Sequence, residues 1–515
     1  MTRSTALQNG AAYTHIGNPP LTERRAATGR PSTGDTVTPD LIASRIDPRR
    51  AKLAGRAAEQ IVADVIELGW PVGEVLGSET ELLERYRVSR AVLREAIRLV
   101  EHQHVARMRR GTGGGLVIDE PDVDAVIGPA VIYLLRVGAT LDEIFDTRVV
   151  LEELVAELAS QRVTETDLTA IRDTLKRESV GDFSDFRLLH TQLAALTGNP
   201  VLELFVDTFS RVSTFHFSDV AALPDDIDED VRRAHGGIAE AVLANDPGLA
   251  RERMRRHLCA EADFIRTQPA TVQRLDPAVA LAGTLGDKRG EALARQIFAE
   301  ITRTGAAPGT FVGSEAALMS RYRASRAVVR EAIRILEYHQ IAMTRRGPGG
   351  GLFVTEPDIS AVVDIIAIYL RRHGVQVRHI AELRSGLELA VVARAAEALR
   401  SGGSDAAAIE RALRAESELG LARAFGHGED FHSMLAALTG NRAFGLVHSV
   451  TLRLGWLFFS QFAVDDSRVG AVSQELPATI GPAHQGIADA LLAGDAELAV
   501  MRMRAHMTVT SPDSL

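Results

Sequence analysis

Cysteine is nearly absent from this chain of 515 residues, and Cys259 is the one that it has. A single thiol excludes an internal disulfide and any zinc cluster built from several cysteines. Aromatic residues are also scarce, at 5% of the chain, whereas Ala, Leu, Arg and Glu are frequent. This composition favours helices over sheets.

Long apolar runs are missing as well. Runs such as Val131–Leu135 and Ile365–Leu370 are far too short to span a membrane. The first residues contain no apolar core of the kind found in signal peptides. We therefore expect a cytoplasmic protein without a membrane partner. Residues 1–50 are rich in Thr, Arg, Pro and Gly without periodicity, which predicts a disordered arm.

The formal net charge is −10, which by itself does not suggest a nucleic-acid partner. Net charge describes the whole chain, however, and DNA responds to a local basic patch. The length predicts about three or four domains, because one hydrophobic core does not grow to this size. The motifs along the chain are therefore more informative about its function than its overall composition.

The chain is a duplication. Ser89–Asp122 and Ser325–Asp358 are identical at 21 of 34 positions without a gap. The heptapeptide LAALTGN occurs at Leu193–Asn199 and again at Leu435–Asn441. Such a repeat is far longer than that of a solenoid, so a whole two-domain unit has been copied once. The boundary between the copies falls near Gln268–Asp287, where Pro, Gly and Thr gather.

Each copy opens with the pattern of a helix-turn-helix. An amphipathic first helix is predicted at Ala54–Leu68, with its counterpart at Gly290–Thr304. Ser78-Glu-Thr-Glu81 forms a capping box for a second helix that runs to Tyr86. After a tight turn, Ser89 is a good N-cap for a third helix, Arg90–His102.

A glycine-rich turn follows, which predicts a β-hairpin wing. Val105–Arg109 and Leu116–Ile118 are the expected strands around Gly111-Thr-Gly-Gly-Gly115. The counterpart strands are Ile341–Arg345 and Leu352–Val354. The glycines could also suggest a phosphate-binding loop, but the Lys-Ser/Thr and the strand-to-helix context of such a loop are lacking.

Arginines recur where a DNA reader needs them. Arg90, Arg94 and Arg98 are four residues apart and share one helix face. Arg109 and Arg110 lie at the tip of the wing, and the second copy repeats the set. For any single arginine, a solvated helix face with ordinary Glu–Arg pairs is an alternative. The same positions in both copies favour contact with guanine edges or phosphates.

These residues resemble the GntR family of bacterial regulators. The resemblance rests on Glu79, Tyr86, Val88-Ser89-Arg90, Arg94-Glu95-Ala96 and Arg110-Gly111. It implies a winged helix-turn-helix in which these arginines contact operator DNA. The predicted DNA-binding residues are Ser89, Arg90, Arg94, Arg98, Arg109, Arg110, Gly111, Ser325, Arg326, Arg330, Arg334, Arg345, Arg346 and Gly347. The family commonly has another Arg at the positions of Thr80 and Ala316, so one contact is missing in both copies.

Three histidines occupy matching places in each following region of amphipathic helices. They are His190, His235 and His257, and then His432, His484 and His506. Three imidazoles from different helices suit a divalent zinc-, nickel- or iron-like ion, one per region. A lone histidine is usually structural, but the matched triplets favour a metal.

This pattern resembles the helical FCD ligand domain of the FadR type. The resemblance implies that the metal, with Arg148 or Arg384, holds a small carboxylic acid effector. The usual Asp ligand is absent, because Phe186 and Gly428 occupy its positions. Asp185 and Asp430 lie nearby in other helical registers. The alternative for the two arginines is an ion pair with Glu152 or Glu388.

We therefore predict a mainly α chain with two winged helix-turn-helix domains and two helical FCD-like bundles in tandem. The predicted domains are an arm at 1–50, winged helices at 51–120 and 286–356, a linker at 269–285, and sensor bundles at 121–268 and 357–510.

The predicted function is a transcriptional regulator, with repression as the default, that binds double-stranded operator DNA and is controlled by a small carboxylate. The two copies would form a pseudo-dimer within one chain, and further homodimerisation is left open. A metal-dependent hydrolytic enzyme and an architectural DNA binder without effector are the alternatives.

Overall fold

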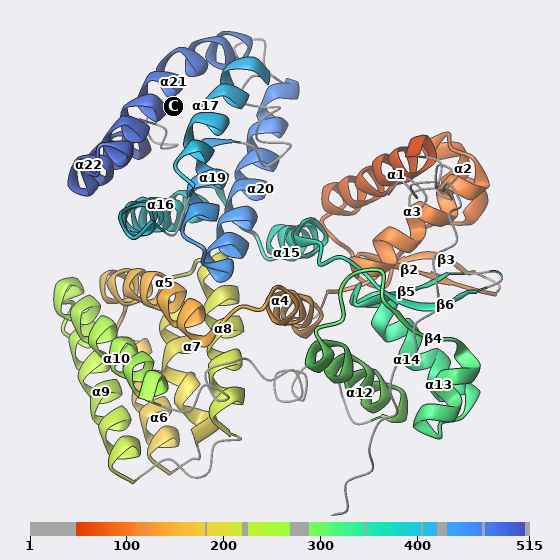
Figure 1. Cartoon of the computed structure of the whole chain (residues 1–515), viewed down its shortest axis with the longest axis horizontal. Coiled ribbons are helices and arrows are strands. Elements are labelled where there is room, and N and C mark those ends of the chain that lie inside the picture. Colours follow the sequence, from red (N-terminus) through yellow and green to blue (C-terminus); the bar gives the residue numbers. More distant parts are fainter. Residues whose placement is uncertain are drawn as a thin grey trace, which may run out of the picture. The chain divides into compact units, whose positions relative to one another are not determined.

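Each half of the chain folds into a small winged unit followed by a helical bundle, as a computed structural model shows (Figure 1). The structure describes residues 48–111, 113–121, 123–180, 183–218, 225–267, 288–345, 347, 349–402, 405–419, 430–465 and 469–509. Most of the predicted arm, the whole predicted linker, Arg346 and Gly428 lie outside these residues. No helix in the described part of the chain is long and apolar enough to cross a membrane.

The first winged unit contains three helices and three strands. In chain order they are α1 (Pro48–Glu67), β1 (Val75–Gly77), α2 (Glu79–Tyr86), α3 (Arg90–His102), β2 (Ala106–Arg109) and β3 (Gly115–Ile118). The second winged unit repeats this order with α12 (Arg289–Thr304), β4 (Phe311–Gly313), α13 (Glu315–Tyr322), α14 (Arg326–Tyr338), β5 (Ala342–Arg345) and β6 (Gly351–Val354). The predicted helices and wing strands are present, with ends shifted by a few residues.

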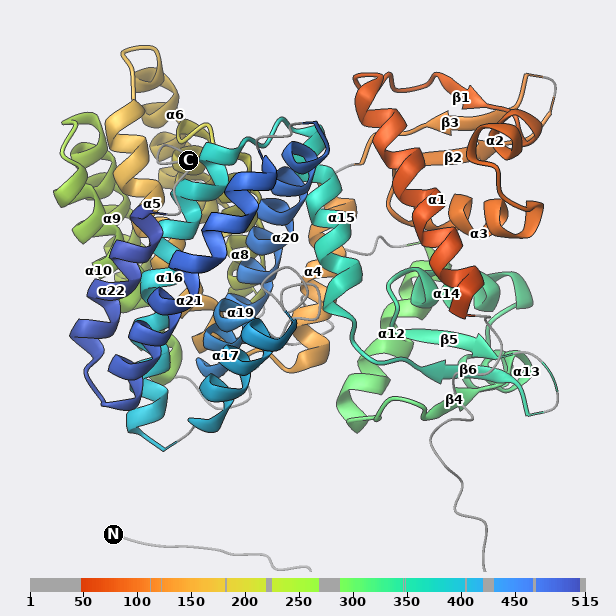
Figure 2. The ribbon, with the colours of Figure 1, turned by 90° about the horizontal axis from the view of Figure 1, so that it is seen from above.

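The predicted hairpin is present as β2 and β3, and β1 adds a third strand that the sequence does not predict. The antiparallel order of this sheet is β1-β3-β2, with Arg109 opposite Gly115, and the second sheet has the same order, β4-β6-β5 (Figure 2). A three-residue strand is too short for an alternating pattern, so β1 and β4 were missed. Gly115 makes this pairing possible, because a Cβ there would lie 2.6 Å from the carbonyl oxygen of Gly77.

The first bundle follows β3 and consists of helices, most of them long. They are α4 (Asp124–Val137), α5 (Leu141–Arg162), α6 (Asp167–Val180), the 3-10 turn η2 (Phe183–Phe186), α7 (Arg187–Leu196), α8 (Pro200–Ser218), α9 (Asp225–Leu243) and α10 (Pro247–Thr267). Helix α5 is central, because it packs against α7, α8, α9 and α10. This position places the side chains of α5 against four other helices of the bundle.

The second bundle has corresponding helices. They are α15 (Ile359–Arg372), α16 (Val377–Arg400), α17 (Ala407–Leu419), α19 (Phe431–Leu438), α20 (Arg442–Asp465), α21 (Val469–Leu492) and α22 (Ala496–Val509). Here α16 takes the place of α5 and packs against α19, α20 and α22. The two bundles share one continuous set of buried apolar side chains.

The repeated heptapeptide LAALTGN ends one helix and starts the next. Gly198 and Gly440 adopt left-handed φ angles of 58° and 66° after α7 and α19, which glycine tolerates without strain. Asn199 then caps α8, because its Oδ1 accepts hydrogen bonds from the backbone amides of Val201 and Leu202. Helix capping accounts for a motif that the sequence shows twice.

The same asparagines also join the two halves in a reciprocal way. The amide of Asn199 donates to the carbonyl oxygen of His379 on α16 at 2.9 Å. The amide of Asn441 donates to the carbonyl oxygen of Glu143 on α5 at 3.0 Å. Residues 143 and 379 are equivalent in the repeat, so each copy gives the other the same contact. Such reciprocity is the signature of a two-fold interface.

A second reciprocal pair links each winged unit to the opposite bundle. Arg136 on α4 donates to the carbonyl oxygens of Gln340 and Glu356, beside the second sheet. Arg372 on α15, the counterpart of Arg136, pairs with Glu120, which follows the first sheet, at 3.2 Å. In addition, Ile368 of α15 packs into the core of the first winged unit.

We predict that Asn199→Asp destabilises the chain by about 1–3 kcal/mol. The carboxylate keeps the Oδ1 that caps α8 but loses the N–H that satisfies the buried carbonyl of His379. It also places a negative charge beside Glu382, to which the amide donates at 3.0 Å. Urea unfolding measures the change.

The matched control is Asn245→Asp, at an exposed position in a surface turn. It should leave the free energy of unfolding within the error of the measurement. Equal stability of the Asn199→Asp variant and the unchanged chain would contradict the role of this amide between the halves.

Candidate functional site

A short turn separates helices α2 and α3 of the first winged unit. Arg87 ends α2 in the left-handed conformation with φ 50°, and the side chain of Ser89 accepts a hydrogen bond from the first turn of α3. Leu93, Ala96 and Val100 of α3 are buried, so the opposite face of this helix is left to solvent. The second unit repeats the turn with Arg323 and Ser325.

The predicted arginines of α3 lie on that exposed face. The side chains of Arg90, Arg94 and Arg98 are 65%, 64% and 72% exposed. Glu79, at the start of α2, lies 3.3 Å from Nε of Arg90 and 3.4 Å from Nε of Arg94. Exposed pairs of this kind are weak, so a phosphate or a base edge can replace the carboxylate.

Helix α14 presents the corresponding arginines. Arg326 and Arg330 are 69% and 65% exposed, and both pair with Glu315, at 3.0 and 3.2 Å. Arg334 is exposed as well. The glutamate that opens the preceding helix therefore holds two guanidinium groups side by side in both copies. The guanidinium groups of α3 and α14 thus face solvent rather than the protein interior. Buried guanidinium groups on these helices would have contradicted the prediction.

The wing carries further cations at its tip. Arg109 and Arg110 are exposed, and Arg109 donates to the carbonyl oxygen of Gly113 at 3.1 Å. In the second wing the guanidinium of Arg345 lies 4.2 Å from the ring centroid of Phe353. A Cβ on Gly114 would lie 2.3 Å from the carbonyl oxygen of Arg109, so this turn admits only glycine. The exposed Gly111 and Gly347 complete the predicted set in the described part of the chain.

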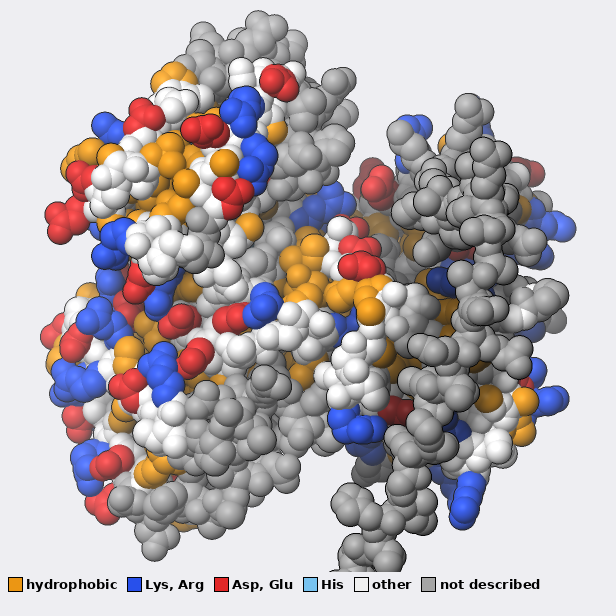
Figure 3. Space-filling model, viewed as in Figure 1, with side chains coloured by type: hydrophobic (Ala, Val, Ile, Leu, Met, Phe, Trp, Pro, Cys, Tyr) orange, Lys and Arg blue, Asp and Glu red, His pale blue; other side chains and the backbone are white. Residues whose placement is uncertain are grey.

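Positive charge is concentrated in the reader segments although the chain is acidic overall. Residues 85–115 contain eight Arg and two Glu, and residues 321–351 contain seven Arg and two Glu. These segments carry net charges of +6 and +5 against −10 for the whole chain. On the face shown in Figure 3, acidic and basic side chains are interspersed over the bundles. A local cationic surface of this kind is what DNA binding requires.

The three histidines of the first bundle meet in its interior. His190 on α7, His235 on α9 and His257 on α10 are 2%, 0% and 5% exposed. The Nε2 atoms of His190 and His235 are 3.2 Å apart, those of His235 and His257 3.1 Å, and those of His257 and His190 3.4 Å. The prediction that these residues lie together is thus correct.

Buried carboxylates orient two of these imidazoles. Nδ1 of His190 contacts Glu152 on α5, and Nδ1 of His235 lies 2.8 Å from Glu178 on α6. An imidazole that donates its Nδ1–H to a carboxylate has a lone pair on Nε2. The Nε2 lone pairs of His190 and His235 then face each other without a proton between them. A cation at their centre resolves this conflict, so the donor set fits a divalent metal.

The charge state of the cluster suits the same purpose. Burial and the neighbouring His235 and His190 hold the pKa of His257 well below its usual value. Burial also lowers the pKa of His235. Although burial alone would raise the pKa of Glu152, the charges of Arg148 and His190 lower it to about 2. At neutral pH His235 and His257 are therefore neutral imidazoles, and the carboxylate of Glu152 is ionised.

The second bundle repeats the cluster with His432 on α19, His484 on α21 and His506 on α22. All three are buried, and their ligand atoms lie within 4.8 Å of one another. Nδ1 of His484 lies 2.8 Å from Glu416, and Nδ1 of His432 lies 3.0 Å from Glu388.

One nitrogen of this second cluster also indicates that the cluster fits a metal. Nε2 of His484 is buried without a hydrogen-bond partner among the described residues. A metal would give this atom the partner that it lacks. Burial, together with His432 and His484, lowers the pKa of His506 to about 3, so this imidazole too is neutral at pH 7.

The aspartates that the sequence places near the missing ligand are used elsewhere. Asp430 caps α19, accepting hydrogen bonds from the backbone amide and the hydroxyl of Ser433. Asp185 lies in the 3-10 turn η2, and neither aspartate is part of a histidine cluster. The ring of Phe186 packs edge-on against His235 at 5.9 Å between centroids. The first site is therefore built from three histidines, with Phe186 in place of a ligand.

Both predicted effector arginines lie beside the clusters, in different environments. Arg148 is 4% exposed and pairs with Glu152 at 2.6 Å and with Glu261 at 3.3 Å. Arg384 is 26% exposed, and its Nε lies 3.5 Å from Glu388. The predicted alternative of ion pairs with Glu152 and Glu388 is thus present at both arginines.

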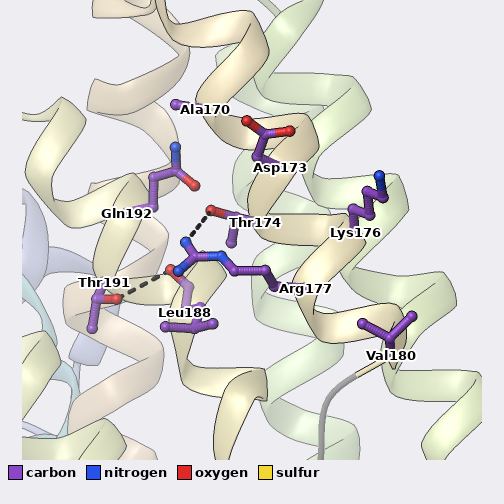
Figure 4. A pocket seen from close by; sticks show the side chains of 9 residues that line it. All are labelled: Ala170, Asp173, Thr174, Lys176, Arg177, Val180, Leu188, Thr191 and Gln192. Carbon is purple, nitrogen blue, oxygen red and sulfur yellow. Dashed lines mark hydrogen bonds between the residues drawn. The ribbon is translucent and has the colours of Figure 1, made fainter.

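Two larger cavities lie around the first bundle. One, of about 770 Å³, is lined by Ala170, Thr174, Arg177, Leu188 and Gln192 among others, between α6 and α7 (Figure 4). None of the clustered histidines lines it. The other, of about 490 Å³, lies between α9 and α10, and both His257 and Glu261 line it. The second cavity is therefore the one that reaches the histidine site.

Sequence reasoning missed the carboxylates behind the histidines. Glu178 precedes His190 by 12 residues, and Glu416 precedes His432 by 16. Because the spacing differs between the copies, the repeat does not align these two glutamates. Both occur as Glu-Ser in the helix before the first histidine of the cluster, which is the signal that could have found them. Glu261 and His448 have no equivalent in the other copy, because Thr510 and Val206 take their places.

Comparison with known families matches these parts of the chain. The FCD domain model matches residues 143–260 and 379–509. The model for bacterial regulatory proteins of the gntR family matches residues 53–115, which covers the first winged unit. The two FCD matches contain all six histidines of the two clusters.

Known regulators resemble about two fifths of the chain each. An uncharacterized HTH-type transcriptional regulator of Mycobacterium tuberculosis is 28% identical over 231 residues, which are 42% of this chain and 90% of the relative. The Exu regulon transcriptional regulator of Escherichia coli is 28% identical over 215 residues, 39% of this chain and 82% of the relative.

Among solved structures, a GntR protein of Streptococcus agalactiae is 21% identical with a TM-score of 0.32, covering 41% of this chain and 99% of its own. The two curated relatives are transcriptional regulators rather than enzymes. The chain belongs to the GntR family of DNA-binding transcriptional regulators with FCD domains, and it contains the FCD domain twice.

Proposed function

We propose that this regulator is a repressor whose two reader–sensor units act as a built-in pseudo-dimer, released from its operator by a small carboxylic acid. The observation that carries the proposal is a buried triplet of imidazoles beside an arginine, present in both bundles of a chain with two arginine-bearing winged units. Binding to chromosomal DNA would place this activity in the cytoplasm.

The reciprocal contacts between the halves support the pseudo-dimer. Asn199 and Asn441 exchange equivalent contacts, as do Arg136 and Arg372. Dimeric winged-helix regulators read pseudo-palindromic sites whose symmetry mirrors that of the protein. A single chain with both readers raises the effective concentration of the second reader once the first is bound.

The histidine clusters support one divalent metal in each bundle. His190, His235 and His257 would hold the first ion, and His432, His484 and His506 the second. Three nitrogen ligands leave a position open, and zinc, nickel and iron accept such a set. When bound, the ion would supply a positive charge that attracts a carboxylate toward the neighbouring arginine.

Helix α5 supports the coupling between effector and DNA. It carries Arg148 and Glu152 at the first cluster, and Glu143, Asp146 and Thr147 at the contact with the second half. A ligand that prefers one arrangement of this helix shifts the populations of the two halves. The affinity for the operator then changes by the same coupling free energy.

An architectural DNA binder without effector is the second candidate. The ion pairs Arg148–Glu152 and Arg384–Glu388 favour it, because an arginine that only stabilises the bundle would make the same contacts. The unpartnered Nε2 of His484 favours the sensor, since a purely structural bundle gains nothing from a buried orphan nitrogen.

We predict that replacing Arg90 and Arg326 together by Ala weakens binding to the selected operator at least tenfold. Each arginine that contacts a guanine edge contributes about 1–3 kcal/mol of discrimination. The operator is first selected from random duplexes with the unchanged chain, and fluorescence anisotropy then measures the affinities. Arg256→Ala, on α10 and equally exposed at 72%, is the control and should bind like the unchanged chain. Similar affinities for all three proteins would refute the reader assignment.

Metal content provides a separate prediction. The purified chain should contain two equivalents of a divalent metal by elemental mass spectrometry. His235→Ala and His484→Ala should each remove one equivalent, because each imidazole serves one bundle only. Full metal content in either variant would show that the ion is bound elsewhere.

The effector prediction uses the operator complex and a panel of acetate, lactate and succinate. At least one of these carboxylates should raise the dissociation constant of the complex several-fold. Arg384→Ala should remove this response, measured relative to the operator affinity of the variant itself. If no carboxylate changes the affinity although two metals are present, the architectural role is favoured over the sensor.

A further inference from the structure

The first bundle contains a carboxylate of its own at the position where an effector would bind. Glu261 lies one helical turn after His257 on α10. Its Oε2 is 3.3 Å from Nη1 of Arg148, and its Oε1 is 3.5 Å from Nε2 of His257. One carboxylate thus spans the guanidinium and the nitrogen that faces the cluster. A bound carboxylic acid would occupy the same position, between this arginine and the ion that His257 would help to hold.

Arg148 is already paired with carboxylates in this arrangement. Its Nε already lies 2.6 Å from Glu152, and its guanidinium carbon lies 5.0 Å from the ring centroid of Phe145. Burial alone would lower the pKa of Arg148, but the charges of Glu152 and Glu261 raise it. The buried carboxylate of Glu152 and the partly buried carboxylate of Glu261 thus both pair with this arginine.

Among the described residues of the second bundle, Arg384 has one carboxylate partner, Glu388. The position equivalent to Glu261 is Thr510, which cannot carry a negative charge. Glu388, the remaining partner of Arg384, is shared with His432 and with His448, whose Nε2 lies 3.2 Å away. His448 stands where the first bundle has Val206, so Arg384 shares Oε1 of Glu388 with this histidine.

The exposure of the two arginines agrees with this difference. Arg384 is 26% exposed and Arg148 only 4%. The Nε of Arg384 lies 3.5 Å from Glu388, and its Nη2 lies 3.4 Å from Nε2 of His432. The guanidinium thus reaches the edge of the second cluster while part of it still faces solvent.

We propose that Glu261 is a built-in competitor that closes the first sensor, so that carboxylate effectors bind only in the second bundle. A group tethered beside its target has a high effective concentration. A free carboxylate must therefore exceed that concentration before it displaces Glu261. The first site keeps the metal and its structural role, and the second responds to the ligand.

The cavity between α9 and α10 shows why removal of Glu261 should open the site. This cavity of about 490 Å³ is lined by both Glu261 and His257, with Arg233, Arg253 and Arg256 also among its lining residues. The side chain of Glu261 is 16% exposed, and it lines the cavity beside His257 where the cavity meets the histidine cluster. Without Glu261, Nη1 of Arg148 loses this carboxylate, and a small anion in the cavity could take its place.

The test uses the full chain with cobalt(II) in both clusters and acetate as the probe. Visible absorption of cobalt reports a change in its ligands independently of DNA. In the unchanged chain, acetate should shift half of the cobalt band, and in Glu261→Ala it should shift the whole band. Glu252→Ala, on the same helix and 51% exposed, is the control and should behave like the unchanged chain.

Single-site chains then assign the response. With His235→Ala only the second cluster is loaded, and acetate should shift its entire band. With His484→Ala only the first is loaded, and the band should stay constant unless Glu261→Ala is added. Circular dichroism verifies the fold of each variant.

The inference rests on the proposed carboxylate sensing, and the outcomes separate the two. A full shift in the unchanged chain, or a half shift in Glu261→Ala, would overturn the role of Glu261 while sensing stands. No shift in any loaded protein would overturn carboxylate sensing itself.

Discussion

The contact of three imidazole nitrogens inside each bundle is the constraint on which the architecture depends. In the first bundle the Nε2 atoms are 3.1 to 3.4 Å apart. Those of His190 and His235 both carry lone pairs when the Nδ1–H groups donate to Glu152 and Glu178, and a cation between them removes that conflict. The buried carboxylates of Glu152 and Glu178 hold the rings in this orientation. Burial makes each of these interactions stronger than it would be in water, and it makes an unpaired member costly.

Because the imidazoles come from three helices, the cluster ties the bundle together at one point. Helix α5 connects the first cluster with the contact between the halves. It carries Glu152, which contacts His190, and Glu143, which contacts Asn441. In the second half, His432 lies on α19, and Asn441 follows that helix within a few residues. Each cluster thus lies within one helix of the contact between the halves.

Duplication within one chain allows the two halves to diverge, which identical subunits cannot do. Glu261 and His448 show this divergence, because each adds a polar group that the other copy lacks. The reader surfaces differ less, since the arginine pair with its opening glutamate is kept in both winged units. The halves have thus retained similar exposed arginines on their winged units while the interiors of their bundles have changed.

The residue pattern alone determined the order of the elements, the reader arginines and the identity of the six histidines. Caps, periodicity and the repeat are local features, and Ser89, Ser325 and the four-residue arginine spacing express them directly. Only the tertiary structure decided which carboxylates contact the histidines and that β1 and β4 complete the sheets. It also decided that Glu261 pairs with Arg148, which is 113 residues away in the sequence. These contacts join helices and strands far apart in the chain, and no local periodicity records which distant side chains a fold brings together.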